Sequence, residues 1–324
     1  MDLSRPAVLR ARRLIAQALA PTAARPRPGT VAEVIRWMGA VQGQTYDAGI
    51  RALGLRAGYG EEAVLKAVAE HEVVRCWPQR GTLHFIPTAD ARWMLRLGNP
   101  RVARSTATRF AALGLSPEDV ATARRALHDA LLADGPLTRP AVYQTFAAAG
   151  VDPTDGRGPY LIRTFGREGD VVQGPRQGKT ETFLHLDALP VTQNDPDPDQ
   201  ALGLLLTRYL HSHGPATMKD LVWWTGLGSR VLRAGLDAAE DVLEVSAGGE
   251  TYWLGAWQEA VTAEELEAAL AATYRLPAFD EYLLGYADKS YALPEELRPQ
   301  VLTKNGLSWP FVVEDGVAVG RDVG

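Results

Sequence analysis

The chain has 324 residues, 46% of them hydrophobic and 23% charged, which suits two or three compact units of a folded protein. The net charge of −5 argues against indiscriminate nucleic-acid binding, and the single cysteine, Cys76, excludes an intramolecular disulfide framework and a multi-cysteine zinc site. The sequence shows no long apolar run and no signal-peptide pattern, so we expect a cytoplasmic protein with no membrane contact, metal or cofactor.

Charge is unevenly distributed along the chain. Residues 1–110 carry 17 Lys and Arg against 8 Asp and Glu, whereas residues 111–324 carry 17 against 31. A phosphate-contacting surface requires an excess of basic groups. We therefore expect any DNA-binding surface to centre on the N-terminal third.

The first segment, residues 1–115, has the element order of a winged helix. Apolar residues recur at helical spacing three times before two short apolar runs, and the ranges are 6–20, 30–41, 61–71, 73–77 and 82–87. Helices are expected again at 88–97 and 100–113. Arg101 and Arg104 lie in the second of these, either against a phosphate backbone or on a solvated helix face.

The same order recurs in residues 116–194 and 195–260. Each predicts three helices and then two strands, and Gly-Pro-x-Thr begins at both 135 and 214. The polar turn 174–179 reads as a wing whose tip carries Arg176, Gln177 and Lys179. We expect a mainly helical α+β chain of three tandem winged-helix units.

Residues 261–324 differ in character. Aromatic and acidic residues crowd 278–286, and Asp315-Gly316 between two short apolar runs is a hairpin signal. These features predict a partial β-barrel. Asp280 and Glu281 are expected to brace this segment against the helices.

Two glutamines, Gln42 and Gln44, follow the second predicted helix among glycines. A carboxamide offers donors and an acceptor but is neither a strong acid nor a strong base. Such a pair suits a reaction in which water is held and a developing cation is stabilised, without a proton delivered to the leaving group. The alternative is that both are solvated loop residues.

Three blocks in order carry a family resemblance: Ala40-Val41-Gln42-Gly43-Gln44, Arg80-Gly81-Thr82-Leu83-His84-Phe85, and Phe279-Asp280-Glu281-Tyr282-Leu283-Leu284-Gly285-Tyr286. Together they resemble the winged-helix DNA glycosylases of the AlkZ/YcaQ type over essentially the whole chain. The resemblance implies a tandem winged-helix protein that closes round a duplex and excises alkylated bases, with some members unhooking interstrand crosslinks. The family's Gln-aliphatic-Gln signature falls on Gln42 and Gln44, with Gly43 replacing the aliphatic residue, and relatives continue past the last hairpin into a complete β-barrel.

We therefore predict a monomeric, monofunctional DNA glycosylase that hydrolyses the N-glycosidic bond of cationic alkylated purines such as N7-alkylguanine, in double-stranded DNA of the nucleoid. A cationic base leaves as a neutral molecule, so the barrier lies in the oxocarbenium-like sugar and the placing of water, which two amides can serve. Monofunctional action follows from the scarcity of amines, because Lys66 is the only lysine before residue 171.

The DNA-binding candidates are residues of the second block, the helix at 100–113 and the second wing: Arg80, Thr82, His84, Arg101, Arg104, Arg176, Gln177 and Lys179. His84 has a core position as its alternative, and the wing residues a solvated loop. The rival function is a winged-helix DNA-binding transcriptional regulator without chemistry. A third possibility is a family relic whose catalysis has decayed.

Overall fold

The computed structural model describes residues 2–98 and 102–323, without the side chains of residues 102–105. Two compact units are formed, the first from residues 1–65 and 196–324 and the second from residues 66–195. The second unit thus ends one residue beyond the segment predicted for 116–194. The predicted division into four segments is finer than these two units and stays a prediction.

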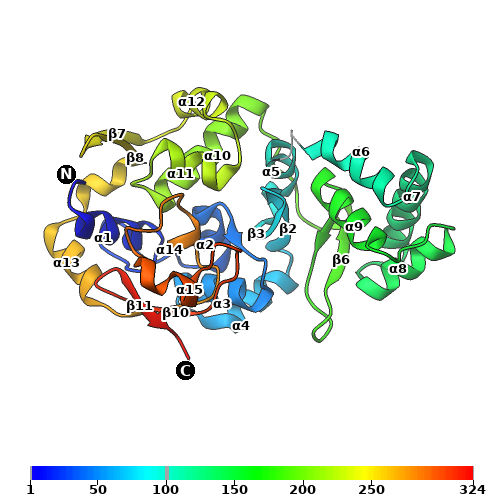
Figure 1. The fold of residues 1–324 in the computed structure, drawn as a ribbon, viewed down its shortest axis with the longest axis horizontal. Coiled ribbons are helices and arrows are strands. Elements are labelled where there is room, and N and C mark those ends of the chain that lie inside the picture. Colours follow the sequence, from blue (N-terminus) through cyan, green and yellow to red (C-terminus); the bar gives the residue numbers. More distant parts are fainter. Residues whose placement is uncertain (1, 99–101, 324) are drawn as a thin grey trace. The chain divides into compact units, whose positions relative to one another are not determined.

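The first unit is mainly helical (Figure 1). Its elements in chain order are α1 (Pro6–Ala16), α2 (Val31–Met38), β1 (Val41–Gln42), α3 (Tyr46–Ala57), the start of α4 (Gly60–Ala69), α10 (Pro198–His213), α11 (Met218–Thr225), α12 (Ser229–Asp237), β7 (Val242–Ala247), β8 (Glu250–Gly255), α13 (Ala263–Ala271), β9 (Tyr274–Leu276), α14 (Glu281–Leu284), α15 (Arg298–Val301), β10 (Phe311–Glu314) and β11 (Val317–Arg321).

The second unit combines five helices with five strands in the described residues. After the end of α4 it contains β2 (Val73–Gln79), β3 (Thr82–Pro87), α5 (Ala91–Gly98), α6 (Val102–Ala112), α7 (Pro117–Asp134), β4 (Leu137–Thr138), α8 (Arg139–Ala148), α9 (Arg157–Glu168), β5 (Val171–Gln173) and β6 (Thr182–His185). The prediction of a mainly helical chain with small β-hairpins is confirmed at this level.

Helix starts follow local chemistry. Ser116, Thr217 and Thr262 each form a capping box with an acidic residue three positions on, which satisfies amide groups that the first turn leaves unpaired. The prediction that Ser116 caps a helix is confirmed.

Three hairpins turn on pairs of residues with positive φ, the conformation that a two-residue turn between twisted strands requires. These pairs are Arg80-Gly81 (52° and 69°), Gly248-Gly249 (60° and 81°) and Asp315-Gly316 (48° and 70°). The predicted hairpin at Asp315-Gly316 is confirmed. Arg80 is the residue for which this conformation is least usual.

The two predicted hairpins of the second unit join into one antiparallel sheet. Its strands follow the order β3-β2-β5-β6-β4, and Arg75 of β2 lies opposite both Phe85 of β3 and Gln173 of β5. The helices pack on this sheet through a buried cluster that includes Leu127, Phe146, Phe165 and Phe183. The pairing of β2 with β5, which joins the two hairpins, was not predicted from the strand patterns.

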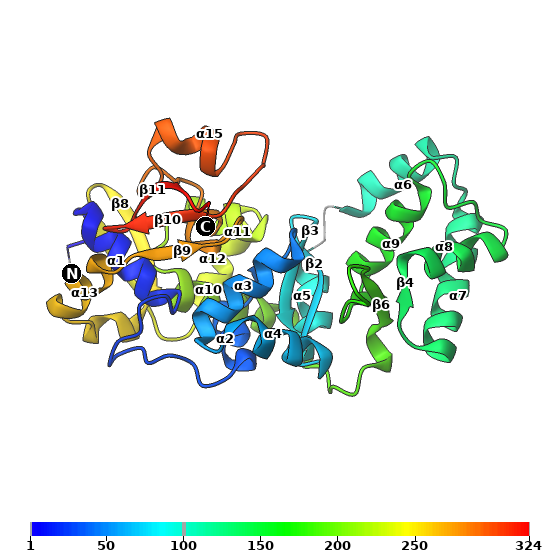
Figure 2. The ribbon, with the colours of Figure 1, turned by 90° about the horizontal axis from the view of Figure 1, so that it is seen from below.

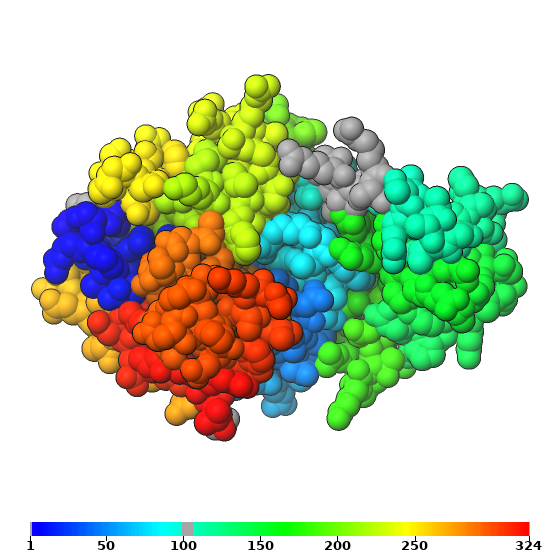
Figure 3. Space-filling view, viewed as in Figure 1, coloured from blue at the N-terminus to red at the C-terminus, as the bar shows by residue number. Residues whose placement is uncertain are grey.

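The first unit brings the N-terminal helix against the C-terminal segment. Leu14 of α1, Tyr282 of α14, Val301 of α15 and Phe311 of β10 share one buried cluster. β9 adds a third strand beside β10, with Phe311 opposite Leu276, so the predicted C-terminal β element is a three-stranded sheet (Figure 2). In Figure 3 the orange-to-red residues of this segment form a continuous surface beside the blue N-terminal residues.

Every helix in residues 2–98 and 102–323 is either too short or too polar to cross a membrane.

Candidate active site

The segment with the two glutamines connects β1 to α3 in the first unit. α2 ends at Met38, and its C-cap Gly39 has a φ of 73°, which favours glycine, before the chain turns into β1. Gln42 is buried, with 8% of its surface exposed, whereas Gln44 is exposed just before α3 begins at Tyr46. The two glutamines therefore face different environments although they stand two residues apart. We call residues 42–44 the glutamine loop.

The side chain of Gln42 folds back onto its own loop. Its Oε1 atom accepts the backbone N–H groups of Gly43 and Gln44, both at 3.0 Å. Two amide donors on one atom identify that atom as the carboxamide oxygen. The oxygen of Gln42 thus binds the loop backbone, whereas Gln44 is an exposed residue.

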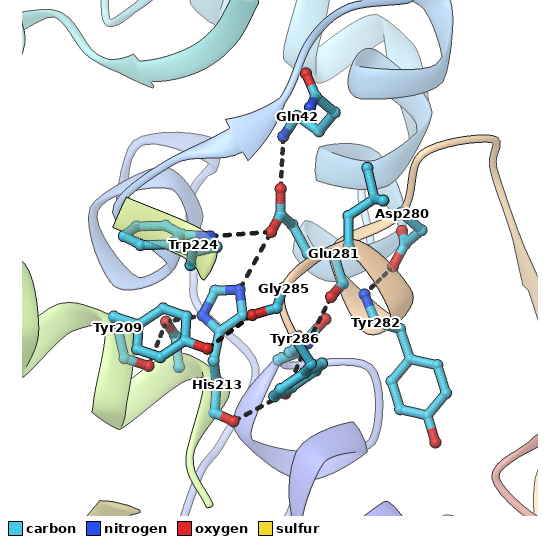
Figure 4. A network of polar contacts seen from close by, with 12 residues as sticks. Gln42, Tyr209, His213, Trp224, Asp280, Glu281, Tyr282, Gly285 and Tyr286 are labelled. Atoms are coloured by element: carbon cyan, nitrogen blue, oxygen red, sulfur yellow. Dashed lines mark hydrogen bonds and ion pairs between the residues drawn. The ribbon is translucent and has the colours of Figure 1, made fainter. Parts of the chain in front are cut away.

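The backbone of Gln42 is held by a carboxylate from the other end of the chain. The Gln42 N–H donates to Oε1 of Glu281 at 2.8 Å, and Nε1 of Trp224 donates to Oε2 of the same carboxylate at 3.2 Å. Nε2 of His213 lies 3.5 Å from Oε2, and Glu281 is fully buried. Figure 4 shows Glu281 at the centre of these groups.

His213 is built into the core behind Glu281. Its ring stacks on Tyr209 at a centroid distance of 4.7 Å, and its Nδ1 lies 2.8 Å from Oγ of Ser212. Burial lowers the pKa of His213, with Glu281 opposing the shift. The ring of His213 is thus fully buried beside the Glu281 carboxylate.

Asp280, the neighbour of Glu281, holds α3. Its two oxygens accept from Arg56 at 2.8 and 2.9 Å, and all the atoms of both side chains are buried. Gln17, at the end of α1, accepts from Arg56 at 2.8 Å and donates to the Glu281 carbonyl at 3.2 Å. The prediction that Asp280 and Glu281 brace the C-terminal segment against the helices is confirmed.

The second unit gathers the predicted residues of the second block at one turn. Arg80 and Thr82 are half-buried at the β2–β3 turn, and His84 is fully buried. The Nδ1–H of His84 donates to the Thr82 carbonyl at 3.0 Å, and its Nε2 lies 3.5 Å from the Arg80 guanidinium. The ring of His84 therefore faces Arg80 from inside the protein.

Two arginines of α9 approach the same turn. Arg163 donates to the Gly81 carbonyl at 3.0 Å, and a Cβ atom built on Gly81 would lie 3.8 Å from the central carbon of the Arg167 guanidinium. We call Arg80, Arg163 and Arg167 the arginine turn. Arg163 and Arg167 were not among the predicted DNA-binding residues, although their four-residue spacing within residues 157–168 places them on one face of a helix.

The remaining DNA-binding candidates belong to the second wing and to the helix predicted at 100–113. Gln177 and Lys179 are exposed at the tip between β5 and β6, and Arg176 is half-buried beside them. Arg101 and the side chain of Arg104 lie outside the described residues. Arg92 and Arg96 of α5, which belong to the basic N-terminal third, form ion pairs with Asp187 and Asp195.

The family described as DNA glycosylase AlkZ-like matches residues 35–321. The chain belongs to this DNA glycosylase family. Its match includes both the glutamine loop and the buried carboxylates of 280–281, and it confirms the resemblance found in the sequence and the predicted enzyme class. DNA is therefore the substrate class of the family to which the chain belongs.

Two comparisons agree with this assignment. The interstrand DNA cross-link repair glycosylase of Streptomyces sahachiroi is 28% identical over 310 residues, which are 90% of this chain and 81% of that protein. The solved structure of the Streptomyces sahachiroi DNA glycosylase AlkZ superposes with a TM-score of 0.77 at 27% identity, covering 99% of this chain and 88% of that one. The fold and the family thus rest on matches that run almost from end to end.

Proposed function

We propose that this member of the DNA glycosylase family hydrolyses the N-glycosidic bond of cationic alkylated purines, such as N7-alkylguanine, in duplex DNA. The observation that carries the proposal is the glutamine loop, which exposes the Gln44 carboxamide while a buried carboxylate anchors the loop from behind. The loop supplies hydrogen-bonding dipoles in place of a strong acid.

The chemistry of the substrate makes such a site sufficient. When the bond between the sugar and an N7-alkylated guanine breaks, the bonding electrons pass to the base and neutralise its positive charge. The leaving group then needs no proton, and the sugar becomes the cation that water must attack. Dipoles aimed at that cation and at the water lower the barrier without any reorganisation during the reaction.

The two catalytic candidates take different parts in this mechanism. The Gln44 oxygen accepts a hydrogen bond from the attacking water and directs the negative end of its dipole to the sugar cation. Gln42 keeps the loop in shape through its oxygen and can donate to the water through its carboxamide nitrogen. The proton that the water finally loses passes to solvent or to Asp47, an exposed carboxylate in the first turn of α3.

DNA contact is proposed for tandem winged-helix units acting in a monomer. Arg80, supported by His84 and joined by Arg163 and Arg167, makes a compact cationic group suited to a phosphate. Thr82 adds a hydroxyl at the same turn. Arg176, Gln177 and Lys179 contact the groove or the backbone from the second wing, and Arg101 and Arg104 contact phosphates.

Interstrand crosslinks are a further proposed substrate. The support is the name of the Streptomyces sahachiroi relative, which is a cross-link repair glycosylase. A crosslink through N7 of a purine carries the same positive charge as an N7-alkyl lesion, so the same leaving-group argument applies.

The test is incubation of the protein with a duplex that carries one N7-methylguanine, scored for free base and for abasic sites. We expect base release with the strand left intact, because a monofunctional enzyme forms no bond to the sugar. Tight binding of the alkylated duplex without any base release over hours would contradict the proposal. That result would fit a DNA-binding transcriptional regulator or a family relic whose catalysis has decayed.

A further inference from the structure

The carboxylate of Glu281 is placed as a support for the glutamine loop. It is fully buried and lies among groups from three separate segments: the Gln42 backbone at the end of β1, the Trp224 indole of α11 and the His213 ring at the end of α10. Removing a carboxylate from water costs several kcal/mol, and apolar residues often replace buried charged groups without loss of stability. Stability alone is therefore a weak reason for a carboxylate at this position.

We propose that Glu281 is a positioning residue for the reaction, which fixes the glutamine loop by holding the Gln42 backbone. The inference rests on the proposed function of that loop. A buried N–H group needs a partner, and for Gln42 the partner is the Oε1 atom of a side chain 239 positions away, at 2.8 Å.

The contact reaches Gln44 in two steps. Glu281 fixes the Gln42 backbone, and the Gln42 oxygen then accepts the N–H groups of Gly43 and Gln44. The backbone from which the exposed Gln44 side chain projects is thus held by a chain of hydrogen bonds that begins at a buried carboxylate.

The acidic pair at the start of α14, with Asp280 as its N-cap, binds both the glutamine loop and the helix that follows it. Glu281 binds Gln42 at its start, and Asp280 binds Arg56 in α3, the helix that follows it. α14 itself is fixed because Tyr209 donates to the Gly285 carbonyl at 2.7 Å. A Cβ atom at Gly285 would lie 2.7 Å from the His213 ring, so the packing behind Glu281 leaves no room to shift.

The chemistry of the site also predicts which replacement retains the contact. Ser212 donates to the Arg208 carbonyl at 2.6 Å, so its oxygen accepts from Nδ1 of His213 and leaves Nε2 of that ring as an acceptor. In Glu281→Gln the side-chain oxygen can therefore accept from the Gln42 N–H, and the NH₂ group can donate to His213. The same NH₂ group then faces the Trp224 N–H, which is also a donor and loses its acceptor. A methionine offers no comparable acceptor.

The experiment compares Glu281→Met and Glu281→Gln in the full chain. Glu244→Met is the matched control, because Glu244 also accepts an indole N–H, from Trp253 at 3.0 Å, but on an exposed hairpin. Three quantities are measured: single-turnover base release from an N7-methylguanine duplex, affinity for the duplex, and amide hydrogen exchange in residues 41–46.

We expect Glu281→Met to slow base release by about tenfold or more, because it leaves the buried N–H groups of Gln42 and Trp224 unpaired. Affinity should stay within about twofold, because phosphate contacts supply it, and exchange in residues 41–46 should rise by about tenfold. Glu281→Gln should recover most of the loss, and adding Trp224→Phe to it should recover more, since the opposing N–H is gone. Glu244→Met should match the wild type.

Two results would overturn the inference. One is Glu281→Met with wild-type base release and wild-type exchange in residues 41–46. The other is amide hydrogen exchange in Glu281→Met that rises equally throughout α10, together with weaker DNA binding. That pattern would show that the substitution loosens the whole first unit and not the glutamine loop in particular. If Glu281→Met does not fold, the test is the double variant Glu281→Gln with Trp224→Phe. Slower base release by this double variant than by Glu281→Gln alone would overturn the inference as well.

A failure of the proposed function gives a different pattern. The wild type itself would then release no base from the alkylated duplex. The exchange measurement needs no substrate, and unchanged exchange in residues 41–46 of Glu281→Met still overturns the anchoring of the loop.

Discussion

At the residue scale, the glutamine loop separates two roles that the sequence made look alike. Gln42 is buried with its oxygen on the loop backbone, whereas Gln44 is exposed. We expect Gln44→Ala to lower single-turnover base release by about 10²-fold, the typical effect of losing one preorganised polar group. Gln42→Ala should lower base release by about the same factor, since it leaves the Gln44 N–H without its acceptor. The double variant should lose less than the product of the two single factors, because both side chains act on one transition state.

The control for this pair is Gln300→Ala, which removes an exposed glutamine in α15. It should leave base release unchanged, and none of these variants should alter affinity for undamaged duplex. Fully multiplicative effects of Gln42→Ala and Gln44→Ala would show that the two side chains act independently and would contradict the hydrogen-bonded loop.

Gly43 is the residue at which the chain departs from the family signature. It is buried and does not belong to the glycines with positive φ, so an L-residue meets no backbone strain there. We expect Gly43→Ala to raise base release by about two- to fivefold, because a Cβ atom at this position reduces the conformations open to the backbone, an effect of roughly 0.4–1 kcal/mol. A fall in the rate with unchanged affinity would show that the loop needs the room that glycine leaves. Gly249→Ala, in a hairpin turn with φ of 81°, should instead destabilise the protein.

At the scale of elements, α14 connects the C-terminal segment to α3 through the buried pair of Asp280 and Arg56. We expect Asp280→Asn to lower the free energy of unfolding by about 3–5 kcal/mol, because it leaves a buried guanidinium without a counter-charge. Glu70→Gln is the control, since its pair with Lys66 is exposed and is worth about 0–1 kcal/mol. Urea denaturation measures both, and a loss below about 1 kcal/mol for Asp280→Asn would show that Arg56 finds other partners.

The elements also show how far sequence patterns reach. Long amphipathic helices such as α7 and α10 and hairpins with marked turns were predicted because their signals are local. α3 was missed because Gly49 and Gly54 interrupt its pattern, and Gly54 is required where a Cβ would lie 2.9 Å from the Gly60 carbonyl. β9 was missed because three residues carry too little alternation to identify a strand.

The candidate site divides in the same way. The type and position of Gln42 and Gln44 could be identified from the sequence with the help of the family resemblance. The contact of Gln42 with Glu281 could not, because no periodicity relates residues 239 positions apart. The sequence predicted only that Asp280 and Glu281 brace the C-terminal segment. The structure shows that Glu281 binds the Gln42 backbone and that Asp280 binds Arg56 of α3.

At the scale of the whole molecule, the structure changes the meaning of the basic N-terminal third. Arg12, Arg13, Arg56 and Arg75 are buried in internal contacts, so part of the excess of basic residues in 1–110 serves the fold. Arg92 and Arg96 are engaged by acidic residues as well. The charge available to DNA is therefore smaller than the sequence count, and fewer arginines must carry the phosphate contacts.

Because few arginines remain for phosphate contacts, the salt dependence of DNA binding tests directly whether Arg101, before α6, and Arg104, within it, make such contacts. If Arg101 and Arg104 each contact a phosphate, replacing both by alanine should weaken binding to any duplex sequence. The slope of log affinity against log salt should become shallower by ~1.8, since each phosphate contact contributes about 0.9. Arg230→Ala with Arg233→Ala makes the same change of charge on the exposed face of α12 in the acidic part of the chain, and it should leave the slope unchanged. Equal slopes for both double variants would place the phosphate contacts elsewhere, and the arginine turn of Arg80, Arg163 and Arg167 would then be the next group to neutralise.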